Sequence, residues 1–190
     1  MISSQDRSYY IGASDTQQVV GNWKTKTFEK WWLEKIGFTH NQIHTEAMMA
    51  GTAYEHRIID SLNISGMEKD KQFISGRLRV NLDGNTPDTI YEIKTYKYQN
   101  GFKVPKHYRE QVWVEMFGSG ITKAYIVAYG LLEEDYNNFY RDIDPIRRQL
   151  FEIQYNEQFI NKIYLPRFQY LSECLDLGKF PKAEEVIFSV

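Results

Sequence analysis

The chain has 190 residues, of which 42% are hydrophobic and 15% aromatic, a composition typical of one globular domain with a substantial core. A formal net charge of -2 provides no global basic field for nucleic acid, so an anionic partner would have to bind at a local basic patch. Cys174 is the single cysteine, which excludes an internal disulfide and a cysteine-based metal cluster. With no apolar signal region at its start and no run approaching the roughly 20 apolar residues of a membrane span, we expect a cytoplasmic protein without membrane contact.

The first third of the chain has helical patterns. The stretch 14–21 predicts a short helix that Ser14 caps and Gly21 ends. Apolar residues at helical spacing predict a second helix over 27–37 and a longer one over 45–63.

Strand patterns follow. From about 73 to 82, apolar residues alternate with polar ones, which indicates a strand with one buried face. The turn sequence GNTP, 84–87, separates it from a β-rich run over 89–96, so the two runs form a predicted hairpin.

The second half of the chain predicts, in order, a helix over 107–120, a hydrophobic strand over 123–132, an edge strand over 147–155 and a final helix over 156–178 that bends near Pro166. We therefore expect one α/β domain over 1–190, with helices around a mixed β-sheet that contains the hairpin.

The second strand of the hairpin carries the candidate chemistry. Side chains at i and i+2 of a strand share a face, so Glu92 and Lys94 must lie side by side, and hairpin pairing can bring Asp83 opposite them. Mg²⁺ prefers oxygen ligands, which the Asp83 and Glu92 carboxylates and the Ile93 carbonyl could supply. Lys94 would steady the attacking water or help to deprotonate it. Together these groups indicate metal-assisted phosphodiester hydrolysis.

A plainer interpretation exists for the same residues. Glu92 and Lys94 would form a surface ion pair on an amphipathic strand, and Asp83 would only shape a turn. An acid-x-lysine triplet recurs by chance, so the triplet alone favours this interpretation.

The triplet is accompanied by three further sequence stretches that favour a functional interpretation. The order of Asp83-Gly84 and Glu92-Ile93-Lys94 resembles the motif of the PD-(D/E)xK nuclease superfamily, although Leu82 replaces the usual proline. Within it, "YYIGASD", "GTAYE" and "YREQVWVEM" resemble three motifs of the phage lambda exonuclease and YqaJ-type viral recombinase family, in the family's order. The matches span about 7–129.

This resemblance implies a restriction-endonuclease-like core and assigns roles to residues. Glu55, Asp83 and Glu92 become acidic metal ligands together with the Ile93 carbonyl. Lys94 becomes the catalytic lysine, and Gln111 a residue that orients it or the water. The alternative for Gln111 is a solvated position on a helix. The implied cofactor is Mg²⁺, with Mn²⁺ as a substitute.

Other residues are candidates for binding DNA. By resemblance, Arg7 and Ser14 fall where the family holds the 5′-terminal phosphate, although Ser14 serves equally well as a helix N-cap. Basic residues just after the active-site strand are candidates for gripping the phosphate backbone: Lys97, Lys103, Lys106 and Arg109.

Tryptophans and lysines interleave earlier in the chain: Trp23, Trp31 and Trp32 with Lys24, Lys26, Lys30 and Lys35. They could line a DNA groove by base stacking and phosphate neutralisation. Alternatively, the tryptophans belong to the core and the lysines form its rim, which is the interpretation that we favour for the tryptophans.

The function that follows is a Mg²⁺-dependent exonuclease of phage or prophage recombination, which digests linear duplex DNA from its 5′ end. The resemblance, and not the spacing, implies this polarity, the preference for double-stranded DNA ends, a homotrimer and a single-strand annealing protein as partner. One alternative is a PD-(D/E)xK endonuclease or repair nuclease. Another is a non-cleaving DNA-binding or inhibitory module, which would have no need of Glu55, Asp83, Glu92 and Lys94 together.

Overall fold

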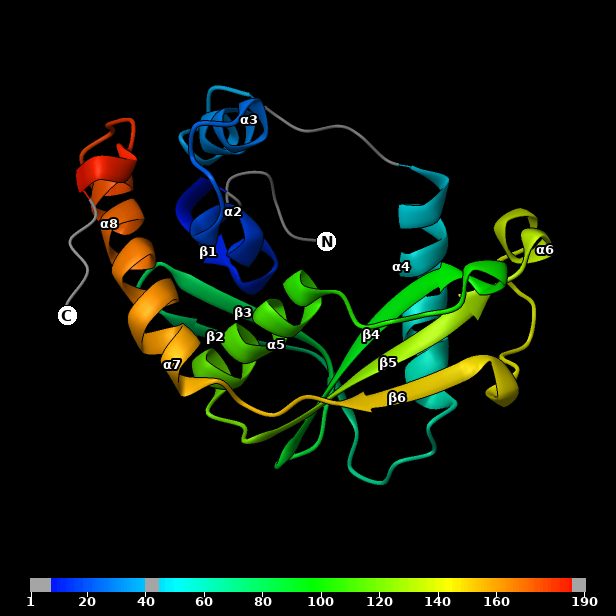
Figure 1. Cartoon of the computed structure of the whole chain (residues 1–190). Coiled ribbons are helices and arrows are strands. Elements are labelled where there is room, and N and C mark those ends of the chain that lie inside the picture. The colour runs from blue at the N-terminus through cyan, green and yellow to red at the C-terminus, as the bar shows by residue number, and fades with distance from the viewer. Residues whose placement is uncertain (1–7, 40–44, 186–190) are drawn as a thin grey trace.

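A mixed β-sheet with helices on both faces forms the protein (Figure 1). The computed structural model describes residues 8–39 and 45–185. The strands are β1 (Ile11–Gly12), β2 (Glu68–Ser75), β3 (Leu78–Asn85), β4 (Thr89–Lys97), β5 (Lys123–Leu131) and β6 (Arg148–Glu152). The main helices are α2 (Thr16–Val20), α3 (Lys26–Lys35), α4 (Glu46–Asp60), α5 (Lys106–Ser119), α6 (Glu133–Asn137), α7 (Glu157–Phe159) and α8 (Leu165–Asp176).

Strand β3 lies inside the sheet and pairs with three strands. One strand lies along one of its edges, and two different strands lie at the two ends of its other edge. β2 pairs antiparallel with β3 along its whole length. Because β2 occupies one edge, β1 and β4 must share the other: β1 pairs with Leu78 and Arg79, and β4 pairs only with Gly84 and Asn85. Within the part of the chain that the structure describes, the edge of β3 between Arg79 and Gly84 therefore has no strand beside it.

The rest of the sheet continues from β4. β5 pairs parallel with β4 over nine residues, from Thr89↔Lys123 to Lys97↔Leu131, and β6 pairs antiparallel with the outer edge of β5. The sheet is therefore mixed, as expected from the sequence, and β6 is the expected edge strand.

The hairpin expected between 73–82 and 89–96 is present as β3 and β4, but the single strand expected over 73–82 is wrong. That range is two strands, because β2 ends at Ser75 and β3 begins at Leu78 after the turn Gly76-Arg77. Gly76 has φ 57°, a backbone conformation that glycine adopts without steric cost. The side chains of β2 are mostly exposed, so this edge strand lacks the apolar alternation that would have revealed it.

The helices expected from the sequence are present, although the first begins at Thr16 and Ser14 does not cap it. The hydroxyls of Thr25 and Thr45 cap α3 and α4 by accepting hydrogen bonds from the backbone N–H groups three residues later. Gly120, with φ 74°, ends α5. The expected final helix is α7 and α8, joined by a π-helical turn over Ile160–Tyr164, and Pro166 is the second residue of α8.

Two hydrophobic cores lie on opposite faces of the sheet (Figure 1). The larger core joins β3, β4 and β5 to α5, α2, α3 and α8, and it contains Trp23, Trp31 and Trp32. The smaller core lies under α4. Because the three tryptophans are buried, the core interpretation is confirmed and base stacking by them is wrong.

Lys35 is also buried and not part of a groove: its ammonium pairs with Asp15 at 2.6 Å and donates to the Tyr10 carbonyl oxygen. In residues 8–39 and 45–185, no helix has both the length and the apolar character needed to cross a membrane.

Candidate active site

The candidate site lies where β3 and β4 separate. Their pairing ends at Gly84↔Tyr91, and beyond this point the Asp83 side chain takes the place of a backbone partner. Asp83 Oδ2 accepts a hydrogen bond from the backbone N–H of Ile93 at 2.8 Å. Since the N–H and C=O of one strand residue point to the same side, the Ile93 carbonyl also faces the edge that β3 has left. Two of the three expected metal-binding groups, Asp83 and the Ile93 carbonyl, therefore lie at this opening.

Glu92 and Lys94 lie side by side on the face of β4 that α5 covers. Lys94 Nζ is 2.7 Å from Glu92 Oε1, and the side chains are only 17% and 3% exposed, respectively. The ammonium also lies 4.7 Å from the centroid of the Tyr108 ring. The predicted shared strand face is confirmed, and the interpretation as a surface ion pair is wrong because both groups are largely buried.

Gln111 of α5 joins this pair through its carboxamide. Lys94 Nζ donates to Gln111 Oε1 at 3.2 Å, and Gln111 Nε2 donates to Glu92 Oε1 at 2.7 Å. A solvated position for Gln111 is therefore wrong: its side chain is a bridge between the acid and the base of the strand motif.

Glu115 is a member of the site that the sequence analysis missed. It lies one helical turn after Gln111, is fully buried, and accepts a hydrogen bond from Gln111 Nε2 at 2.8 Å. The available signal was the i, i+4 spacing from Gln111, which places Glu115 on the same side of α5 as Gln111.

Glu55 approaches from the opposite face, on α4. It lies within electrostatic reach of Asp83 and Glu92. Its carboxylate also groups with His56 and Asp70: among the described residues, these three offer potential ligand atoms all within 4.8 Å of one another. His56 Nε2 is 2.9 Å from Asp70 Oδ2. Glu55 thus stands between the strand motif and a more exposed His–Asp pair.

Burial and mutual repulsion shift the protonation of this cluster. Burial raises the pKa of Asp83 well above its usual range, and the charge of Glu92 raises it further. Burial and the charge of Glu92 likewise raise the pKa values of Glu55 and Glu115. Burial lowers the pKa of Lys94, but the surrounding carboxylates, Glu92 first, outweigh this and raise it overall. Four carboxyl groups thus share one ammonium.

These groups fit a hard divalent cation. Glu92 Oε2 is buried and has no hydrogen-bond partner among the described residues. The donors at the open edge of β4 are oxygens, which Mg²⁺ and Mn²⁺ prefer. A cation would also offset the excess of negative charge. Asp83, Glu92 and the Ile93 carbonyl could hold it, with Glu55 nearby.

The candidate phosphate contacts differ in their surroundings. Ser14 does not cap a helix: it lies inside a 3₁₀ turn, Ala13–Asp15, and Asp15 accepts the hydrogen bond from the Gly12 N–H. The N-cap expectation is therefore wrong. Ser14 is exposed, and its turn packs against α5 and β3, close to the helix that carries Gln111. Arg7 lies outside the described residues.

The basic residues at the end of β4 and just after it are exposed, as a phosphate-binding patch requires. Lys106 forms an ion pair with Glu110 at 3.4 Å. Lys97, Lys103 and Arg109 have no ion-pair partner in residues 8–39 and 45–185. Three cations are thus available to an external anion.

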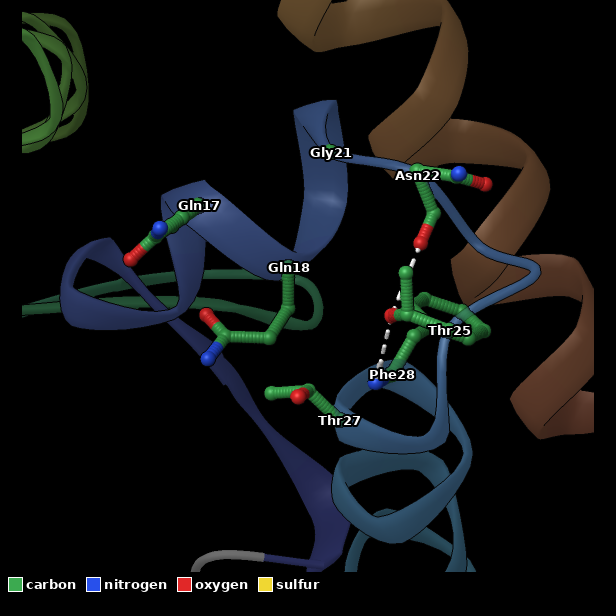
Figure 2. A pocket seen from close by; sticks show the side chains of 7 residues that line it. All are labelled: Gln17, Gln18, Gly21, Asn22, Thr25, Thr27 and Phe28. Carbon is green, nitrogen blue, oxygen red and sulfur yellow. Dashed lines mark hydrogen bonds between the residues drawn. The ribbon is translucent and has the colours of Figure 1, made fainter.

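A separate pocket of about 280 Å³ lies between α2 and α3 (Figure 2). Its walls are uncharged: Gln17, Gln18, Gly21, Asn22, Thr25, Thr27 and Phe28. It contains none of the residues of the strand motif and none of the residues predicted from the sequence to bind DNA or metal.

Comparisons with known proteins find similarity only in structure. Neither a scan against protein-family models nor a search of curated proteins finds a match. The chain is similar to the alkaline exonuclease LHK-Exo of Laribacter hongkongensis, with a TM-score of 0.69 and 19% identity over 92% of this chain and 91% of that one. It is also similar to a phage-related exonuclease of Haemophilus somnus 129PT, with a TM-score of 0.61 and 15% identity over 92% and 97% of the chains.

These TM-scores and identities show similarity of fold. They confirm the expected fold class, a mixed sheet flanked by helices, and at the level of fold they confirm the resemblance based on the four motifs. The chain therefore has the α/β fold shared by these two exonucleases.

Proposed function

We propose that this protein is a metal-dependent deoxyribonuclease that degrades linear duplex DNA from its ends. The observation that carries the proposal is the buried Glu92–Lys94–Gln111 network beside Asp83, at the edge of β4 that β3 leaves open. The shared fold with two exonucleases supports it, and LHK-Exo has also been solved in complex with dAMP.

Asp83, Glu92 and the Ile93 carbonyl would hold Mg²⁺, or Mn²⁺ in its place, and Glu55 would complete or adjust this set. The bound metal supplies Lewis-acid activation of the scissile phosphate and a water of lowered pKa. The protein holds these oxygens rigidly, because Asp83 is fixed by the Ile93 N–H and Glu92 by two donors.

Lys94 would stabilise the charge that develops on the phosphoryl oxygens. Its ammonium donates to Glu92 and Gln111 and lies against the Tyr108 ring, so its position is set before the substrate arrives. Such preorganised charge is worth more in a buried site than in water, because no solvent has to reorganise around it.

DNA would approach past the exposed cations Lys97, Lys103 and Arg109, with Lys106 beside them, and their phosphate contacts would be independent of sequence. Arg7 and Ser14 would hold a 5′-terminal phosphate and so set the 5′→3′ direction. A homotrimer around the duplex and a single-strand annealing protein as partner complete the proposal, which places the enzyme in phage or prophage recombination in the bacterial cytoplasm.

One assay tests this function. Linear and closed circular duplexes, labelled at the 5′ or 3′ end where linear, are incubated with the protein with and without Mg²⁺, and Lys94→Ala serves as the inactive control. Loss of linear DNA only with Mg²⁺, with early release of the 5′ label, supports a 5′→3′ exonuclease. Linearisation of circles would instead favour the endonuclease, and binding without cleavage the DNA-binding module. Light scattering of the protein in solution measures its oligomeric state.

A further inference from the structure

We infer that Glu115 is a positioning residue: its buried carboxylate fixes the orientation of the Gln111 carboxamide and, through it, the place of the Lys94 ammonium. The inference rests on the proposed function of the same site. The role of Glu115 follows from its contacts, its burial and the absence of a stabilising reason for an acid at this position.

The Gln111 carboxamide has donors on one side and an acceptor on the other, so a half-turn of its plane exchanges them. Its Nε2 donates to Glu92 Oε1 at 2.7 Å and to Glu115 Oε1 at 2.8 Å, which uses both amide protons. Its Oε1 is then the atom that faces Lys94 Nζ, at 3.2 Å. The reverse orientation would place the amide oxygen against the Glu92 carboxylate and the Glu115 Oε1 acceptor, and the amide N–H groups against the Lys94 ammonium. Two acceptors therefore fix the plane of the Gln111 carboxamide, whereas a single acceptor would allow that plane to rotate.

Glu115 has no evident role in folding. It is 0% exposed, its Oε2 has no hydrogen-bond partner among the described residues, and no ion pair in residues 8–39 and 45–185 includes it. A buried carboxylate opposes folding unless it is fully paired, whereas an apolar side chain would pack beside Val112 and Met116 of the same core. The residue is thus costly to the fold, and its side chain interacts with Gln111 and Glu92, both members of the site.

The orientation of the Gln111 carboxamide affects the position of the Lys94 ammonium through the hydrogen bonds that the ammonium donates. An ammonium has three protons, and Lys94 directs two toward Glu92 Oε1 and Gln111 Oε1. The third remains for a ligand outside this pair, such as a phosphoryl oxygen. If the Gln111 oxygen turned away, Lys94 would keep only one acceptor and could rotate about it, so its charge would lie in the correct place for a smaller fraction of the time.

A double-mutant cycle tests the coupling. Glu115→Leu should lower kcat by about 10- to 100-fold, the usual effect of losing a supporting hydrogen bond behind a site, with little change in KM for DNA and no fall in Tm. Glu115→Gln should restore most of the lost activity, because the introduced carboxamide oxygen accepts the same hydrogen bond. In a Gln111→Ala background, Glu115→Leu should have no further effect on kcat. Met116→Leu is the matched control for repacking this helix.

Three outcomes would overturn the inference. The first is an unchanged kcat in Glu115→Leu, and the second is an equal loss of kcat in the presence and absence of Gln111. The third is a loss of kcat that is accompanied by a fall in Tm, because the variant would then be less stable as a whole. A second measurement does not depend on cleavage. In ¹⁵N-labelled protein, the Gln111 side-chain amide protons should exchange slowly with solvent, remain protected in Glu115→Gln and lose protection in Glu115→Leu. Wild-type protein that does not cleave DNA would refute the proposed function, while unaltered Gln111 protection in Glu115→Leu would refute the role of Glu115.

Discussion

The carboxylate of Asp83 accepts a hydrogen bond from the backbone N–H of Ile93 at the point where β3 and β4 separate. One side chain thus closes the end of the hairpin ladder with one oxygen, and its second oxygen is not used in that hydrogen bond. Asp83→Asn keeps a hydrogen-bond acceptor for the Ile93 N–H but removes the negative charge. We expect a folded protein with at least about tenfold weaker Mn²⁺ affinity by calorimetry and a loss of cleavage. Unchanged Mn²⁺ binding would show that Asp83 is not a ligand.

Lys94 should separate catalysis from binding. Lys94→Ala removes the charge proposed to stabilise the reacting phosphate, so kcat should fall by about 10²- to 10³-fold while Mg²⁺-dependent DNA binding stays largely intact. The substitution also leaves Glu92 buried without its cation, so the free energy of unfolding should fall by about 3 kcal/mol. Gel-shift and cleavage assays must therefore be run well below the measured Tm. Near wild-type cleavage would reduce Lys94 to a structural residue.

A prediction about pH follows from the raised pKa values of Asp83, Glu55 and Glu115. Burial is the first cause in each case, so the native state holds these protons more tightly than the unfolded chain does. Their contribution to stability is present below the unfolded pKa values, near 4, and is lost as pH rises through the folded ones. The Tm of metal-free protein should therefore decline as pH rises from mildly acidic to neutral.

Mg²⁺ and Glu115→Leu provide the controls for that decline. Mg²⁺ should reduce it, because the cation favours the ionised carboxylates of the native state. Glu115→Leu should flatten it by removing one of the titrating groups. A metal-free Tm that rises steadily over the same range would contradict the assignment of raised pKa values to this cluster.

A buried ion pair far from the strand motif should matter for folding alone. Asp135 of α6 is fully buried and bonds Arg147, which also donates to the Gly130 carbonyl oxygen. Asp135→Ala leaves the buried Arg147 with only the half-exposed Asp144, 3.8 Å away, as an ion-pair partner, so urea unfolding should show a loss of about 3–5 kcal/mol. The exposed Asp142, 3.9 Å from Arg57, is the matched control, and its replacement by alanine should change stability by less than about 0.5 kcal/mol. Equal effects would contradict the difference in burial.

The sequence predicted those parts of the site that depend on local periodicity. The shared face of Glu92 and Lys94 follows from the two-residue repeat of a strand, and α5 follows from its apolar spacing and terminal glycine. What it missed depends on contacts between distant segments. β2 is an exposed edge strand without a pattern, so Asp70 and its pairing with His56 could not be foreseen. Glu115 looked like an ordinary helical acid, because its burial behind Gln111 is set by how α5 packs on the sheet.

The last prediction concerns direction, and it depends on Ser14 and Arg7. Ser14 is exposed on a turn that packs against α5 and β3, so its hydroxyl can donate to an anion beside the site without losing a capping role. An arginine fork and a hydroxyl together would bind a terminal phosphate through charge-assisted hydrogen bonds. Linear duplex with a 5′-phosphate should therefore be degraded faster than the same duplex with a 5′-hydroxyl. Arg7→Ala and Ser14→Ala should each shrink the difference, whereas Lys24→Ala, an exposed cation paired with Glu184, should not. Equal rates on both substrates, with efficient cutting of closed circles, would replace the exonuclease by an endonuclease and leave the metal site unaffected.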